Sequence, residues 1–320
     1  MVASSAPQLH AAYKGVCAHA AISLCRIAIW TGSGGEGKPL RLQQLAVAAT
    51  VKQALLLGEI GLEQQSIDAN DRLIRSWAQS VDPVIRTNVA WAMTNKGYSL
   101  IQLERGAEAV DVLKGLDDYA PAQEPFLRPL AQGLHNLALA LDELGRHNEV
   151  APIYERIDRM LRQADNDVLW PHHAWALAGM AADLRDHGNC DAAIKICDAI
   201  LDRWWLLNPS TVPDALHAIL ANTIRTRADC LVALGAYDEA IADVDLVTSR
   251  YLSSHSGDVA DEVAWAMVTK GQALQTSGHT EHAKLTFETV VQHYGSSTQP
   301  TIRGAVHAAR RLRSSLEQPS

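Results

Sequence analysis

The stretch ADCLVALGAYDEAIADVDLV, residues 228–247, decides the fold because its pattern recurs along the chain. It has a small residue at 228, a leucine three residues later, a second small residue at 240 and an aliphatic residue at 247. The copies lie 41 to 47 residues apart, and their first small residues are Ala54, Gly97, Ala138, Ala181, Ala228 and Gly271. A period of this size is typical of stacked repeat proteins, in which function comes from a surface.

Each copy indicates a pair of helices. Apolar and small residues follow one another at spacings of three and four, as in Val89, Met93 and Gly97, which is the helical period. A proline or polar turn opens most first helices. A small residue at the helix crossing lets the two backbones approach, so we predict an all-α fold. The glycines that end the first helices are Gly61, Gly145, Gly188, Gly235 and Gly278, with Glu104 at the corresponding position of the second copy.

This spacing resembles the tetratricopeptide repeat (TPR) family. Its consensus also places a large residue three after the first small one, alanine twelve after it and an apolar position seven beyond. The resemblance covers roughly residues 40–300 and implies an α-solenoid of about six helical hairpins forming a right-handed superhelix. The period is near 43 residues rather than about 34, which is similar to long-period arrays of bacterial regulatory and scaffold proteins.

The pattern also predicts the organisation of the chain. We expect an N-terminal helix and Gly-rich linker at 1–38, and a C-terminal capping helix and tail at 300–320. Between them we expect six repeats, at 39–82, 83–124, 125–169, 170–211, 212–256 and 257–299.

Composition excludes several classes of function. The net charge of −8 argues against a nucleic-acid partner, because phosphate binding needs clustered Lys and Arg. The five cysteines are scattered with no CxxC, and no HExxH occurs, so we expect no metal and no cofactor. Cys190 and Cys197 lie seven residues apart, which places both on one face of a helix as core or groove thiols.

The chain has no stretch of about 20 apolar residues, so we expect no membrane partner. The apolar run from Ala20 to Trp30 is interrupted by Arg26 and is not followed by an A-x-A-like cleavage site. A secretory signal is therefore not expected, and the cytoplasm is the expected location.

Three tryptophans occupy the same position of their repeats, six residues before the small residue: Trp91, Trp175 and Trp265. One interpretation is packing between repeats. The other is an aromatic ladder on the concave face, since aromatic side chains are favoured in binding hot spots. Their exposure to solvent distinguishes the two.

Polar residues follow the same face of the first helices. In TPR domains that bind peptides, the resemblance implies, these inward positions carry the contacts. Asn side chains can both donate to and accept from an extended peptide backbone. With the tryptophans, the candidate groove residues are Lys52, Asn95, Tyr98, Gln132, His135, Asn136, Asn222, Arg225, Asp229 and Gln272.

The segment GSGGEGKP, residues 32–39, matches the GxxxxGK part of a phosphate-binding P-loop. Pro39 stands where that loop needs a hydroxyl for magnesium, and no sheet is expected to carry it. We interpret the segment as a linker. The apolar residues 8–30 before it could pack on the chain's own array. Alternatively, they could pack on a second copy, and the chain would then be a homo-oligomer.

The leading hypothesis is therefore a non-enzymatic scaffold that binds a peptide or protein segment in its concave groove. Two alternatives stay open: a regulator that senses a small ligand in a Trp-lined groove, and a nucleotide-dependent switch through residues 32–39. The repeats occupy nearly the whole chain and leave no room for a catalytic domain, so we expect no enzyme. Residue order alone cannot identify a Ser/His/Asp or Cys/His constellation in a chain of this size.

Overall fold

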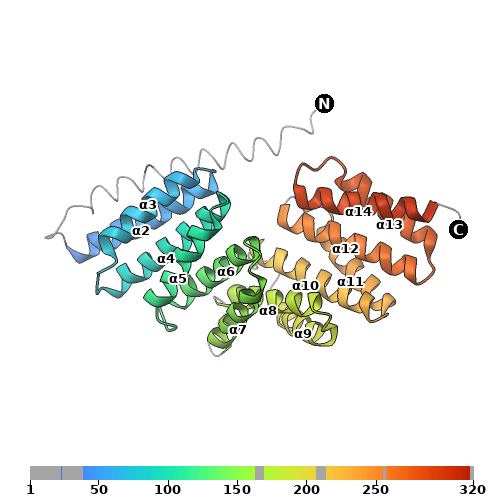
Figure 1. The fold of residues 1–320 in the computed structure, drawn as a ribbon, viewed down its shortest axis with the longest axis horizontal. Coiled ribbons are helices and arrows are strands. Elements are labelled where there is room, and N and C mark those ends of the chain that lie inside the picture. Colours follow the sequence, from blue (N-terminus) through green and yellow to red (C-terminus); the bar gives the residue numbers. More distant parts are fainter. Residues whose placement is uncertain (1–22, 24–38, 163–168, 207–213, 255–256, 318–320) are drawn as a thin grey trace. The chain divides into compact units, whose positions relative to one another are not determined.

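The computed structural model describes residues 23, 39–162, 169–206, 214–254 and 257–317 (Figure 1). All regular secondary structure in these ranges is helical, which confirms the all-α prediction. The predicted N-terminal helix and linker, including residues 32–38 of the P-loop-like segment, lie outside the described residues except for Ser23. The helices are α2 (Leu40–Glu59), α3 (Glu63–Trp77), α4 (Pro83–Gln102), α5 (Gly106–Tyr119), α6 (Leu127–Glu143), the 3-10 turn η1 (His147–Glu149), α7 (Val150–Leu161), α8 (Trp170–Asp186), α9 (Cys190–Leu206), α10 (Asp214–Ala233), α11 (Tyr237–Tyr251), α12 (Gly257–Thr276), α13 (Thr280–Tyr294) and α14 (Pro300–Glu317).

The chain divides into two compact units, which we call unit 1 (Met1–His172) and unit 2 (His173–Ser320). The boundary falls within the first turn of α8. Each unit is described by itself below.

Both units stack helices in the same way. In unit 1, α2 packs on α3, α3 packs on the next first helix, α4, and the first helices α2, α4 and α6 also pack on one another. In unit 2, α10 packs on α11 and α12, and α14 packs on α12 and α13 at the end of the chain. Within each unit, the first helices thus form one layer and the second helices form the other (Figure 1). One face of the first helices remains available as a surface.

The turn inside each hairpin repeats one set of hydrogen bonds. Between α10 and α11, the Ala236 N–H donates to the Leu231 carbonyl at 2.9 Å, and the Gly235 N–H donates to the Val232 carbonyl at 3.1 Å. Gly235 has a φ of +79°, the left-handed conformation that such helix ends require. The predicted helix-ending glycines all share it, and Glu104 adopts it at 58°. In every hairpin the recurring leucine of the sequence pattern accepts the bond that comes from the N–H five residues later; these leucines are Leu57, Leu100, Leu141, Leu184, Leu231 and Leu274.

The small residues lie at the helix crossings. Ala54, Ala138, Ala181 and Ala228 are completely buried. At Gly97 an added methyl group would lie 2.5 Å from Cδ2 of Leu113, a contact that only glycine avoids. First helices of 17 to 20 residues account for the long repeat period.

Candidate functional site

The first helices of unit 1 enclose a pocket of about 780 Å³. Its walls come from α2, α4 and α6, with Glu63 and Ser66 added by α3. We call it the unit 1 pocket. Its polar and aromatic lining residues are Lys52, Glu59, Glu63, Ser66, Trp91, Thr94, Asn95, Tyr98, Ser99, Gln102, Arg128, Gln132 and Asn136.

Six of the candidate groove residues line this one pocket. They come from three successive first helices, whose common repeat position brings them together. The repeat register in the sequence therefore identified side chains that the fold gathers on one surface. These residues are Lys52, Trp91, Asn95, Tyr98, Gln132 and Asn136.

Part of the pocket wall is held by internal hydrogen bonds. The Asn136 amide nitrogen donates to the Thr94 carbonyl at 3.3 Å, and its oxygen accepts from Nε2 of Gln132 at 3.1 Å. The Thr94 hydroxyl donates to the Pro129 carbonyl at 2.9 Å. These hydrogen bonds link α4 to α6. Because Asn136 is only 2% exposed, they hold the floor of the pocket in place.

Other polar groups of the pocket are not used internally. Among the described residues, neither the Asn95 amide nor the Lys52 ammonium has a hydrogen-bond or ion-pair partner. Asn95 is half-buried and Lys52 is exposed. An amide can donate and accept at the same time, so Asn95 is able to bind both groups of a peptide bond.

Aromatic rings and charges of both signs complete the pocket. The Arg128 guanidinium lies 5.7 Å from the ring centroid of the half-buried Trp91, a cation–π contact between α6 and α4. Tyr98 is 47% exposed. Glu59 and Glu63 stand on the wall formed by the end of α2 and the start of α3. The surface therefore offers apolar, amide and charged contacts together, as a peptide-binding surface requires.

His135 does not line the unit 1 pocket, although it was a candidate. It is 7% exposed and lies against Tyr154, with ring centroids 6.4 Å apart. It directly precedes Asn136 in the chain, and one residue turns a helix by about 100 degrees, so the two side chains face different directions. Burial, with a smaller contribution from His172, lowers the pKa of His135 to about 4. It is a neutral core residue.

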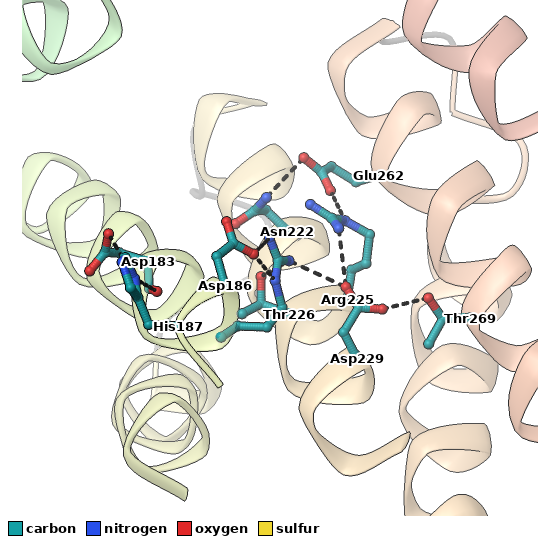
Figure 2. A network of polar contacts seen from close by, with 10 residues as sticks. Asp183, Asp186, His187, Asn222, Arg225, Thr226, Asp229, Glu262 and Thr269 are labelled. Atoms are coloured by element: carbon teal, nitrogen blue, oxygen red, sulfur yellow. Dashed lines mark hydrogen bonds and ion pairs between the residues drawn. The ribbon is translucent and has the colours of Figure 1, made fainter. Parts of the chain in front are cut away.

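The candidate residues of unit 2 form a polar network instead (Figure 2). The Asn222 amide donates to Glu262 at 2.9 Å, and Nε of Arg225 donates to the other Glu262 oxygen at 2.5 Å. One Asp229 oxygen accepts from Arg225 and from Arg185, each at 3.2 Å. The network therefore joins α8, α10 and α12.

The charges of this network compensate one another. Burial disfavours the charged form of Arg225, but the carboxylates of Glu262 and Asp229 outweigh it and raise its pKa. The second Asp229 oxygen accepts from the Thr269 hydroxyl at 2.5 Å. Asn222, Arg225 and Asp229 are thus engaged with their own chain, unlike Asn95 and Lys52.

The remaining candidates of unit 2 lie outside this network. Gln272 is exposed on α12, and Trp175 is 37% exposed on α8. Trp265 is half-buried against α14, where a methyl group at Gly304 would lie 3.3 Å from the indole ring. Trp91 and Trp265 both contact the following first helix, so packing between repeats is part of their role.

Sequence reasoning missed three residues that matter here: Arg128, Arg185 and Glu262. The spacing of Arg225 and Asp229, four residues apart on one helix, was a usable signal for an ion pair. Glu262 follows Arg225 by 37 residues, less than one repeat, so the repeat register alone does not pair the two residues. Arg128 had no signal beyond its place before Pro129 at a helix start.

Among the described residues, the cysteines and possible metal ligands form no second site. Cys190, Cys197 and Cys230 are buried, and burial raises the pKa of Cys197 to about 12. In the part of the chain that the structure describes, no group of three or more His, Cys, Asp or Glu side chains could hold a metal ion. Within the same ranges, every helix is too short or too polar to cross a bilayer.

No protein-family profile matches the chain, and no curated protein does either. Solved structures do match its fold. The apo form of RapI has a TM-score of 0.65 at 9% identity, covering 96% of this chain and 82% of that one. A Rap protein complexed with Competence and Sporulation Factor has a TM-score of 0.53 at 11% identity, with coverages of 96% and 88%.

NprR in complex with its cognate peptide NprX has a TM-score of 0.52 at 12% identity, covering 94% of this chain and 85% of that one. At such identities the likeness concerns the fold alone. It agrees with the stack of helices described above. The chain therefore has the all-α helical-repeat fold that these structures share.

Proposed function

We propose that this chain is a non-enzymatic adaptor that binds a peptide or protein segment in the unit 1 pocket. The observation that carries the proposal is the combination of Asn95 and Lys52, unused within the chain, with the aromatic surface of Trp91 and Tyr98. An extended peptide needs amide groups for its backbone and apolar surface for its side chains. The pocket supplies both.

The matched structures support this proposal by analogy. NprR is seen with its cognate peptide NprX, and a Rap protein is seen with Competence and Sporulation Factor. A repeat array uses its first-helix layer as a binding surface. In unit 2 the candidate polar residues Asn222, Arg225 and Asp229 are already paired within the chain, so we propose the ligand for unit 1.

The test selects peptides from a random display library on the full-length chain and measures their affinities. Asn95→Ala and Lys52→Ala should each weaken the selected peptides, because a lost hydrogen bond costs about 0.5–1.5 kcal/mol, or roughly two- to twelvefold in Kd. Asn148→Ala is the matched control, since Asn148 is an exposed amide of unit 1 outside the pocket. If neither Asn95→Ala nor Lys52→Ala changes the Kd of the selected peptides, the proposed site is wrong.

A small ligand in the same pocket is the second candidate, and Trp91 favours it because its indole ring lines the wall. Metabolite pools that change tryptophan fluorescence in the wild type, and fail to do so in Trp91→Phe, would support this reading. It is excluded if no pool changes the fluorescence while peptides bind.

A further inference from the structure

A pocket of about 430 Å³ lies in unit 2 between the end of α13 and α14. We call it the α14 pocket. Its charged and hydrogen-bonding lining side chains are those of Tyr294, Ser297, Arg303, His307 and Arg310. Three of these side chains are basic, and no acidic residue lines the pocket. A concave surface with charges of one sign favours a ligand of the opposite sign, so this pocket favours an anion.

The basic side chains share one face of α14. Arg303, His307 and Arg310 are spaced four and three residues apart, and all three are exposed. Arg310 lies about 10 Å further along the helix than Arg303. Its guanidinium nevertheless reaches back to the end of α13, because a methyl group added at Gly295 would lie 3.8 Å from its Nη2. The two guanidinium groups therefore approach the same pocket.

The basic groups of the α14 pocket are not used within the chain. Among the described residues, neither arginine of the pocket has an ion-pair or hydrogen-bond partner for its side chain, and the same is true of His307. Other arginines of unit 2 are paired, Arg225 with Glu262 and Arg227 with Asp243. Carboxylates are not scarce, since the chain has 36 acidic and 28 basic residues. The cations gathered in this pocket are thus available to a ligand.

A buried hydroxyl adds a second indication of a ligand. Tyr294 is 6% exposed, and its hydroxyl has no hydrogen-bond partner among the described residues. Tyr251, 43 residues earlier, has the same repeat position, and its hydroxyl is hydrogen-bonded to Nδ1 of His217 at 2.8 Å. One repeat after His217 stands Ala260, which cannot supply that bond. Burial raises the pKa of Tyr294 to about 12, so its hydroxyl stays protonated and able to donate.

The charge of the pocket fits a phosphate group better than a carboxylate. A phosphate monoester carries a charge of about −1.5 to −2 at pH 7, which matches two guanidinium groups. A carboxylate or a phosphate diester carries a single negative charge. Guanidinium groups also form paired hydrogen bonds to phosphate oxygens. Ser297 adds a hydroxyl, whose oxygen accepts from the Gln299 N–H at 3.2 Å and whose hydrogen can still be donated.

We propose that the α14 pocket binds a phosphate dianion, held by the guanidinium groups of Arg303 and Arg310 with His307 and Ser297 as further donors. The ligand is inorganic phosphate or the phosphate group of an organic monoester. The site belongs to unit 2 and does not depend on peptide binding in the unit 1 pocket.

Phosphate titrations of the full chain, isotope-labelled at arginine and followed by NMR at constant ionic strength, test this proposal. Inorganic phosphate and O-phosphoserine should each produce saturable shifts of arginine side-chain signals. Arg303→Gln and Arg310→Gln should each raise the Kd at least about tenfold, because each removes charge-assisted hydrogen bonds. Arg311→Gln is the matched control: Arg311 is an exposed arginine of the same helix outside the pocket, and its substitution should change the Kd less than about twofold.

Further probes decide which chemistry the pocket recognises. Dimethyl phosphate and acetate carry one charge each, so both should bind at least about tenfold more weakly than inorganic phosphate. Tighter binding of O-phosphoserine than of inorganic phosphate supports an organic monoester as the ligand, and the reverse order supports free phosphate. The proposal is overturned if neither phosphate probe binds saturably, or if Arg311→Gln weakens binding as much as the two pocket substitutions. It is also overturned if acetate or dimethyl phosphate binds as tightly as inorganic phosphate.

Discussion

At Gly97 the crossing of α4 and α5 leaves no space for a methyl group. It would lie 2.5 Å from Cδ2 of Leu113, which is 1% exposed and cannot move aside. Gly115 on the partner helix is different, because a methyl group there would lie 3.6 Å from Cε of Met93, an ordinary contact. Gly97 is therefore required for close packing of the two helices, whereas the position of Gly115 has room for an alanine.

We expect Gly97→Ala to lower the free energy of unfolding by about 1–3 kcal/mol through overpacking. Gly115→Ala should raise it by up to about 1 kcal/mol, because alanine favours the helix and restricts the unfolded chain. Urea unfolding of the full chain, followed by circular dichroism, measures both. Equal effects of the two substitutions would contradict the close packing at Gly97.

At the scale of helices, Asp229 is the centre of the network that joins α8, α10 and α12 (Figure 2). Its side chain is 25% exposed, whereas Asp245, which pairs with Lys270 between α11 and α12, is 55% exposed. Water therefore screens the Asp245–Lys270 ion pair far more than the contacts of Asp229 with its arginines.

Asp229→Ala should therefore destabilise unit 2 by about 2–3 kcal/mol, since it leaves two arginines without a shared carboxylate in a partly buried site. Asp245→Ala should cost no more than about 1 kcal/mol. Hydrogen exchange of peptides from α10 and α12 reports on this unit directly. If Asp229→Ala loses no more protection from exchange than Asp245→Ala does, the network adds little stability.

The same helices show how far sequence could predict the fold and the site. The helical period and the glycine positions predicted hairpins, because local spacing alone decides which residues share a face. The same register predicted that Asn95 and Gln132 lie on one surface. It could not predict that Arg225 forms an ion pair with Glu262, because this pairing depends on which side chains meet across helices.

The burial of His135 was also beyond the reach of the sequence. It lies next to Asn136 in the chain, and the pattern treated both as groove residues. Both residues are buried, and which of them lines the unit 1 pocket depends on the packing of α7, whose Tyr154 lies beside the His135 ring. The division into two compact units likewise follows from the packing of whole helices, which a repeat period does not encode.

At the scale of the whole molecule, two buried histidines should make unit 1 sensitive to acid. His135 and His172 both belong to unit 1, and burial lowers the pKa of each to about 4. Their pKa in the unfolded chain is about 6.5. Between these values the unfolded chain binds more protons than the folded one, so stability is complete above pH 6.5 and is lost as the pH falls toward 4.

For His135 this linkage amounts to about 2 kcal/mol at pH 5, or roughly thirtyfold in the opening equilibrium, with less from the more exposed His172. Hydrogen exchange, corrected for the intrinsic pH effect, should show peptides of α4 and α6 opening more at pH 5 than at pH 7. His135→Gln should reduce this pH dependence, because glutamine does not titrate, whereas His282→Gln on an exposed position of α13 should leave it intact. If α6 opens equally at both pH values, His135 is not held neutral in the core. Acid that acts through His135 should also weaken the helices that line the unit 1 pocket, so the affinity for peptides that we propose to bind there should fall over the same pH range.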